Sequence, residues 1–138
     1  TSDGGRLVAG AALLRPDLFA AVVSRDGAVF VEAGIQGGSP ILADDLDLLK
    51  TRAGRRLADR YWPDRLFDTA RGCAPMLLTS WRGDQRVPAT QSRALAAKLL
   101  EAGCDVLLIE REGGNHATTD AELLASVYGY FADRLGLD

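Results

Sequence analysis

The sequence predicts an α/β fold in which about three parallel strands are flanked by helices. Three short apolar runs have the length and composition of buried strands, at residues 19–24, 75–81 and 106–109. Segments of helical periodicity lie between and after them, and this alternation is typical of a parallel sheet covered by helices. The chain has 138 residues, which suits a single domain with one core.

Composition narrows the class of protein. The chain is 47% hydrophobic and 25% charged, as ordinary globular proteins are, and its net charge of -3 offers no electrostatic footprint for nucleic acid. No apolar run reaches the roughly 18 residues that a membrane span needs. The first residues lack the basic start and apolar core of a signal peptide. We therefore expect neither a nucleic-acid nor a membrane partner; the compartment stays open, with the cytoplasm slightly favoured.

The two cysteines, Cys73 and Cys104, are too few for a disulfide framework and lack the spacing of metal ligands. We expect both to be buried as small apolar residues. No metal or other cofactor is predicted.

In the first half, a helix precedes Pro16, which ends its pattern. Its apolar residues recur at helical spacing: Leu7, Val8, Ala11 and Ala12. After the strand at 19–24, glycine and proline make residues 33–43 loop-like. A charge-rich helix is predicted from Asp44 to about Arg60, and Pro63 closes this region.

The second half gives clearer signals. Pro88 can occupy the first turn of a helix that ends at Gly103. Thr119 and Glu122 have capping-box spacing at the start of the last helix. The apolar stripes of these two helices are Leu95, Leu99 and Leu100, and then Leu124, Val127, Tyr128, Phe131 and Leu135. We expect Leu95, Leu99, Val127 and Phe131 to cover a buried strand core of Val22, Leu77, Leu78, Leu107, Leu108 and Ile109.

Ser2 is the first candidate for chemistry. It lies in Thr1-Ser2-Asp3-Gly4-Gly5, directly before the first helix. A serine nucleophile can occupy a sharp strand-to-helix turn, where flanking glycines prevent clashes with the neighbouring strand and helix. Taken alone, a Ser-x-Gly-Gly run is more often an ordinary turn or a helix cap.

Asp84 and His116 are the other two candidates. Asp84 follows the strand at 75–81, and His116, the single histidine of the chain, follows the strand at 106–109. In isolation, Asp84 is better explained as a helix cap or a partner for Arg82 or Arg86, and His116 as a solvated loop residue. Both nevertheless fall at the carboxyl ends of parallel strands, where open α/β sheets place their active sites.

The three residues together are more specific than any one of them. Their order along the chain, Ser2, Asp84 and then His116, is that of the α/β-hydrolases. In that chemistry His116 accepts the proton of Ser2 as the serine attacks a carbonyl, and Asp84 orients and stabilises the imidazolium. The backbone N–H of Asp3 becomes one donor to the oxyanion.

Longer motifs extend the pattern over nearly the whole chain. After Ser2-Asp3-Gly4-Gly5 come Arg15-Pro16-Asp17-Leu18-Phe19 and Ala21-Val22-Val23, then Gly83-Asp84-Gln85-Arg86-Val87-Pro88, and finally Gly114-Asn115-His116. These motifs, in this order, resemble the prolyl oligopeptidase family of serine peptidases. Two departures stand out. Asn115 separates glycine from histidine, and Asp26-Gly27-Ala28-Val29-Phe30 replaces the family's usual Asp-Met segment, so the substrate pocket does not transfer.

The resemblance implies that residues 1–138 are the C-terminal part of an α/β-hydrolase catalytic domain that lacks its N-terminal strands. It implies a peptide substrate, with Ser2, Asp84 and His116 as catalytic residues. The strand before Ser2 and the second oxyanion donor would lie upstream, so the isolated chain is expected to be impaired. Two alternatives stay open: a non-catalytic module that pairs with another chain or self-associates through an exposed strand edge, and an esterase on small molecules.

Overall fold

The computed structural model describes residues 1–29, 47, 49–67 and 72–137. Within them the elements follow in this order: α1 (Asp3–Leu14), the short 3-10 helix η1 (Pro16–Leu18), β1 (Val22–Arg25), α4 (Arg52–Tyr61), α5 (Pro63–Leu66), β2 (Met76–Trp81), α6 (Thr90–Glu101), β3 (Val106–Arg111) and α7 (Ala121–Leu135).

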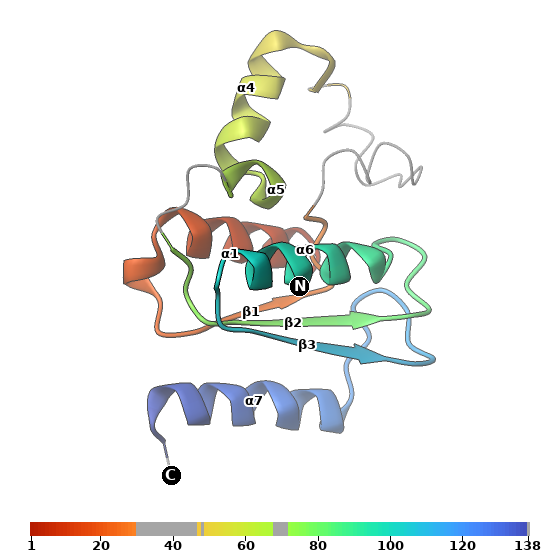
Figure 1. Cartoon of the computed structure of the whole chain (residues 1–138). Coiled ribbons are helices and arrows are strands. Elements are labelled where there is room, and N and C mark those ends of the chain that lie inside the picture. The colour runs from red at the N-terminus through yellow and green to blue at the C-terminus, as the bar shows by residue number, and fades with distance from the viewer. Residues whose placement is uncertain (30–46, 48, 68–71, 138) are drawn as a thin grey trace.

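The three strands form one parallel sheet in the order β1-β2-β3. Helices α1 and α6 cover one face of the sheet and α7 covers the other, while α4 and α5 lie beyond α1 and α6 (Figure 1). The sequence-based expectation of about three parallel strands flanked by helices is therefore confirmed. Because all strands run the same way, the loops that follow them gather at one edge of the sheet.

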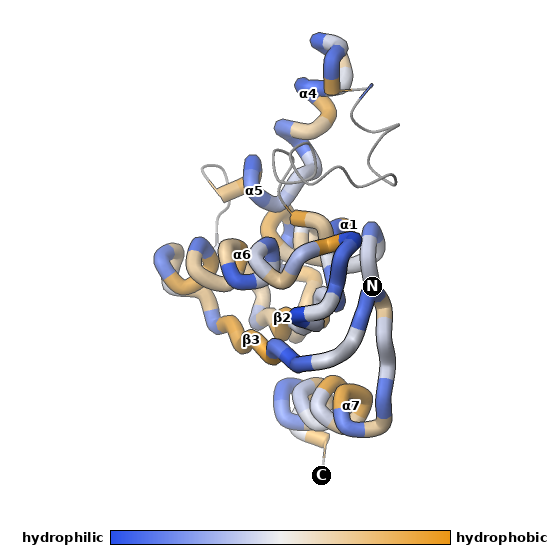
Figure 2. The backbone as a smooth tube through the Cα atoms, turned by 90° about the vertical axis from the view of Figure 1, so that its right-hand side faces the viewer, coloured by the Kyte–Doolittle hydropathy of each residue, from blue (hydrophilic) through white to orange (hydrophobic). Residues whose placement is uncertain are grey.

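Two apolar clusters hold these layers together. The larger lies between the sheet and the helices α1 and α6, and includes Leu13, Leu78 and Leu95. The smaller lies against α7, where Leu77 and Trp81 meet Val127. Apolar residues are concentrated on the strands and on the helix faces that meet them (Figure 2). The predictions that Val22, Leu77, Leu78, Leu95, Leu99 and Val127 are buried are confirmed.

Two core predictions are wrong, because Leu107 is 50% exposed and Leu108 is 37% exposed. Leu100, predicted on the apolar stripe of its helix, is 62% exposed. Within the described residues β3 pairs only with β2, and an edge strand is covered less completely than a central one. Leu100 lies on α6 one residue beyond Leu99, so its side chain points away from the sheet side. Ile109 and Phe131 are partly buried and pack against the α7 cluster.

The final helix also differs from expectation. Its N-terminal cap is Asp120, whose carboxylate accepts a hydrogen bond from the N–H of Leu123 at 2.7 Å, rather than Thr119. Tyr128 and Leu135 on the predicted apolar stripe are exposed. The buried residues of α7 are Leu123, Val127 and Tyr130, which pack with Leu77 and Trp81 of β2.

Boundaries shift at the other elements. The first strand begins at Val22, because η1 occupies the residues before Phe19. Helix α6 begins at Thr90 rather than Pro88, and Gly103 follows its end with a positive φ of 75°. The predicted loop at 33–43 and the first residues of the predicted helix from Asp44 lie outside the described residues. Helix α4 occupies the later part of that range.

Cys73 and Cys104 form a disulfide, with their Cα atoms 5.8 Å apart. The sequence did not predict this bond. The expected burial is confirmed for Cys104, and Cys73 is partly buried against the same cluster. Cys73 precedes β2 and Cys104 precedes β3, so residues 31 positions apart in sequence meet where neighbouring strands begin. The disulfide lies at the amino ends of the strands, opposite the edge where the site loops gather. None of the described helices is long and apolar enough to cross a membrane.

Candidate active site

Ser2 lies on a tight turn at the entrance to α1. Its φ of 56° and ψ of -127° are unusual for a residue that is not glycine. The turn is fixed to the carboxyl end of β1, because the N–H of Ser2 donates to the carbonyl of Arg25 at 2.9 Å. This contact places Ser2 at the edge of the sheet where the strands end.

Gly5 permits the close contact between α1 and β1. A Cβ at this position would lie 2.8 Å from the carbonyl oxygen of Arg25 and 3.0 Å from the Cα of Gly27. The hydroxyl of Ser24 donates to the carbonyl of Gly5 at 2.9 Å, which ties the helix to the strand at the same point. Of the two glycines that the sequence places after the serine, Gly5 therefore has a steric reason, whereas a Cβ on Gly4 would meet open space.

Asp84 lies in the loop after β2, and its side chain is fully buried. One carboxylate oxygen accepts hydrogen bonds from the backbone N–H groups of Arg86 at 2.8 Å and Val87 at 2.9 Å. The other oxygen is 2.7 Å from Nδ1 of His116. Asp84 thus has a defined orientation, set by the turn that follows it.

His116 connects the two other predicted residues. Its Nδ1 faces Asp84, and its Nε2 is 2.9 Å from the hydroxyl oxygen of Ser2. The sequence separations are 32 and 114 residues, so the contacts depend on the alignment of all three strands. The structure brings Ser2, Asp84 and His116 together as one hydrogen-bonded chain at the carboxyl edge of the sheet.

The His116 loop is anchored by a residue from each strand. The carbonyl of Thr118 accepts hydrogen bonds from the guanidinium of Arg25 at 3.2 Å and from the indole N–H of Trp81 at 2.9 Å. Arg111 pairs with Asp120 at 3.1 Å. Arg25, Trp81 and Arg111 did not emerge from the sequence as site residues. What the three residues share is their position, since each is the last residue of its strand.

A sequence model of the prolyl oligopeptidase family matches residues 1–138. The chain belongs to the prolyl oligopeptidase family. The resemblance drawn from the motifs is therefore confirmed. Among proteins with curated descriptions, no match to the sequence was found.

Solved structures support the fold of this family member. It superposes on a puromycin-hydrolysing peptidase of Mycobacterium tuberculosis with a TM-score of 0.78 and 23% identity, over 99% of this chain and 22% of that one. A prolyl endopeptidase superposes with a TM-score of 0.79 and 18% identity, over 99% of this chain and 22% of that one. Esterase PE8 superposes with a TM-score of 0.66 and 18% identity, over 96% of this chain and 46% of that one. The chain thus spans about a fifth of the length of these peptidases.

The oxyanion donor expected from Asp3 lies next to this site. Asp3 is the first residue of α1, and the first N–H groups of a helix have no acceptor within it. Its carboxylate is paired with Arg6 of the next turn at 3.2 Å. The Arg6 guanidinium lies 4.3 Å from the centre of a Trp62 ring, which links this turn to the segment between α4 and α5.

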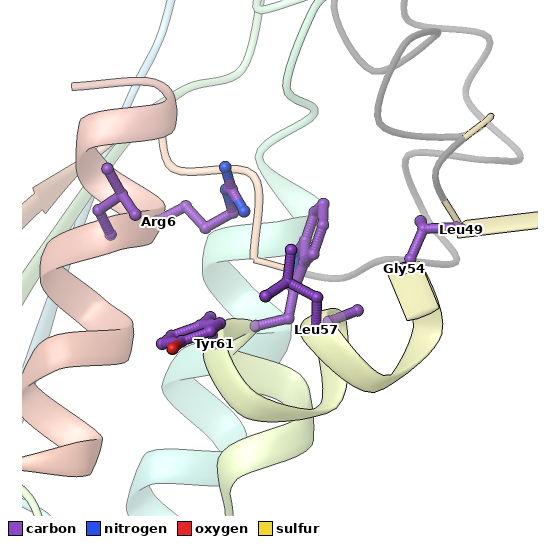
Figure 3. A pocket seen from close by; sticks show the side chains of 8 residues that line it. Arg6, Leu49, Gly54, Leu57 and Tyr61 are labelled. Atoms are coloured by element: carbon purple, nitrogen blue, oxygen red, sulfur yellow. The ribbon is translucent and has the colours of Figure 1, made fainter. Parts of the chain in front are cut away.

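A mostly apolar pocket opens beside the same turn of α1 (Figure 3). Its volume is about 250 Å³, and helix α4 supplies half of its lining residues. The lining side chains include Leu49, Leu57, Tyr61 and Trp62, with Arg6 as their charged neighbour. No cluster of three or more residues able to hold a metal ion is present among the described residues.

Proposed function

We propose that this member of the prolyl oligopeptidase family is a serine hydrolase of peptides in which Ser2, Asp84 and His116 are the catalytic residues. The observation that carries the proposal is the continuous hydrogen-bonded chain from Ser2 Oγ through both ring nitrogens of His116 to Asp84. A serine alcohol is a weak nucleophile, and an adjacent imidazole held by a carboxylate is the standard means of activating it.

In the proposed reaction, Ser2 Oγ attacks the carbonyl carbon of the substrate while Nε2 of His116 takes the hydroxyl proton. Asp84 holds the Nδ1–H tautomer and stabilises the imidazolium. The negative charge on the carbonyl oxygen is met by the N–H of Asp3. His116 then returns the proton to the leaving amine, and water hydrolyses the acyl-enzyme by the same steps.

We propose peptides rather than small esters as the substrate because most of the similar proteins are peptidases. The family is one of peptidases, and the peptidase structures superpose with TM-scores of 0.78 and 0.79, against 0.66 for the esterase. The three residues by themselves suit either substrate. A peptide anilide and an activated ester of the same acyl group distinguish the two. Turnover of the ester with no turnover of the anilide would support the esterase alternative.

The proposal includes a partner for the exposed edge of β1. Within the described residues β1 pairs only with β2, and we propose that upstream sequence supplies the strand that enters the Ser2 turn and a second oxyanion donor. Losing one such donor costs on the order of 10²–10³ in rate. The chain alone is therefore expected to react slowly, or to self-associate through that edge.

A fluorophosphonate probe tests the catalytic role directly. The complete product of the gene is expected to be labelled at Ser2, and more rapidly than residues 1–138 alone. Ser2→Ala abolishes labelling, whereas Ser126→Ala on α7 serves as a matched control and leaves it intact.

Asp84→Asn is the second arm of this test. It keeps the shape of the side chain but favours the wrong imidazole tautomer, and should slow labelling by up to about 10⁴. Asp133→Asn, an exposed position on α7, is its control. A gene product that is folded yet never labelled at Ser2 would leave a non-catalytic module as the better account.

A further inference from the structure

Asp26 is a buried carboxyl group that the proposed mechanism does not use. It directly follows β1 and is only 1% exposed. Neither carboxyl oxygen makes a hydrogen bond with any described residue. Its backbone has a positive φ of 48°, and its N–H donates to the carbonyl of Thr79 at 2.9 Å. A strained, enclosed and unpartnered carboxyl group is costly, and such features cluster at functional sites.

The charged groups around Asp26 belong to the site itself. Asp84 after β2 and His116 after β3 both act on it electrostatically, as does Arg25 of its own strand. The N–H of Ala117 also attracts the carboxyl, but it lies outside hydrogen-bond geometry. Asp26 therefore lies close to the Asp84 and His116 loops, and directly after Arg25, whose carbonyl holds the Ser2 turn.

The two carboxyl groups of the site have opposite environments. Asp84 accepts two backbone N–H hydrogen bonds and faces the imidazole, so its negative charge is compensated. Neither oxygen of Asp26 has such a donor among the described residues, and enclosure without donors favours the neutral form of a carboxyl group over the ionised one. Burial raises the pKa of Asp26, and the charge of Asp84 raises it further, against smaller lowering effects of His116 and Arg25.

We propose that Asp26 is a positioning residue of the site. It lies enclosed beside the Asp84 and His116 loops as a neutral carboxylic acid, so that Asp84 remains the anion facing His116. The inference rests on the proposed function for its catalytic consequence. Ionisation of Asp26 as the pH rises would place two carboxylates at neighbouring strand ends, and their repulsion would disturb the hydrogen bond between His116 and Ser2.

Carboxyl carbon NMR of the chain tests the ionisation state of Asp26. The resonance that disappears in Asp26→Asn identifies the residue. It is expected to keep the chemical shift of a protonated acid to a higher pH than the value of about 3.9 at which aspartate ordinarily titrates. The ring signals of His116, the single histidine of the chain, should move when Asp26 loses its proton. An Asp26 carboxyl that titrates near pH 4 would overturn the proposal.

The pH dependence of Ser2 labelling in the complete gene product tests the consequence for the site. The wild type should lose at least half of its labelling rate on the alkaline side as Asp26 ionises. Asp26→Asn, which cannot ionise, should lack that decline, while Asp133→Asn should retain it. An alkaline decline that persists in Asp26→Asn contradicts the proposal. If the wild type is not labelled at any pH, the proposed function fails, and the carboxyl titration still decides the state of Asp26.

Discussion

Gly83 and Gly114 lie against each other, and at neither position is there room for a side chain. A Cβ on Gly83 would overlap the carbonyl oxygen of Gly114, and a Cβ on Gly114 would overlap the ring of Trp81. Gly83 immediately precedes Asp84, and Gly114 lies two residues before His116. The two loops that supply the acid and the base are therefore in direct backbone contact.

Gly114→Ala is expected to destabilise the fold and displace His116. The added methyl group overpacks against Trp81, a cost of about 1–3 kcal/mol. Gly129→Ala is the matched control, because Gly129 lies on α7 with open space around it and alanine should stabilise the helix by about 0.5–1 kcal/mol. Urea denaturation measures both variants. Equal changes in the free energy of unfolding of the two variants would show that the close contact between Gly114 and Trp81 is unimportant.

Leu78→Ala tests the larger apolar cluster. Leu78 is 1% exposed on the central strand, and its truncation should lower the free energy of unfolding by about 2–5 kcal/mol. Leu107→Ala on the neighbouring strand removes the same atoms from a side chain that is 50% exposed, and should cost less than half as much. Thermal or urea denaturation provides the comparison. A Leu78→Ala variant as stable as the wild type would contradict the packing described for β2.

The disulfide between Cys73 and Cys104 should contribute about 3–4 kcal/mol to the free energy of unfolding, since it closes a loop of about 30 residues in the unfolded chain. A reductant should lower the urea midpoint of the wild type and leave the Cys73→Ser, Cys104→Ser double variant unchanged. Because the bond lies at the amino ends of the strands, the labelling of Ser2 should survive its removal wherever the chain stays folded. Two titratable thiols in the oxidised, folded protein would contradict the pairing.

Asp26 also makes the stability of the chain depend on pH. Its pKa is raised in the folded state, so the folded protein holds this proton more tightly than the unfolded chain does. The stability contribution is complete below about pH 4, where both states are protonated, and it decreases as the pH rises towards the raised pKa. Asp26→Asn should therefore gain stability relative to the wild type between pH 4 and pH 7. A difference between the two proteins that does not change with pH would exclude a raised pKa.

Periodicity and strand composition were sufficient to predict the sheet, because buried strands such as 75–81 carry apolar residues on both faces. They failed at Leu107 and Leu108, since an equally apolar run does not reveal whether a strand lies at the centre or at the edge. The pairing of Cys73 with Cys104 depends on which strands are neighbours, which spacing along the chain does not encode.

The candidate site divides in the same way. Ser2, Asp84 and His116 could be found because chain order and position after strands carry a signal. Arg25, Trp81 and Asp26 could not, because their roles arise from interactions between residues that are 37 to 93 positions apart in sequence.

The anchoring of the His116 loop by all three strands has a consequence for folding. Its contacts to Arg25 and Trp81 span 93 and 37 residues, and long-range contacts of this kind form only after the segments they join have come together. The assembly of Ser2, Asp84 and His116 is therefore expected to be a late event in refolding. A collapsed intermediate with its helices already formed would lack the site altogether, so the environment of His116 would report on completion of the native sheet.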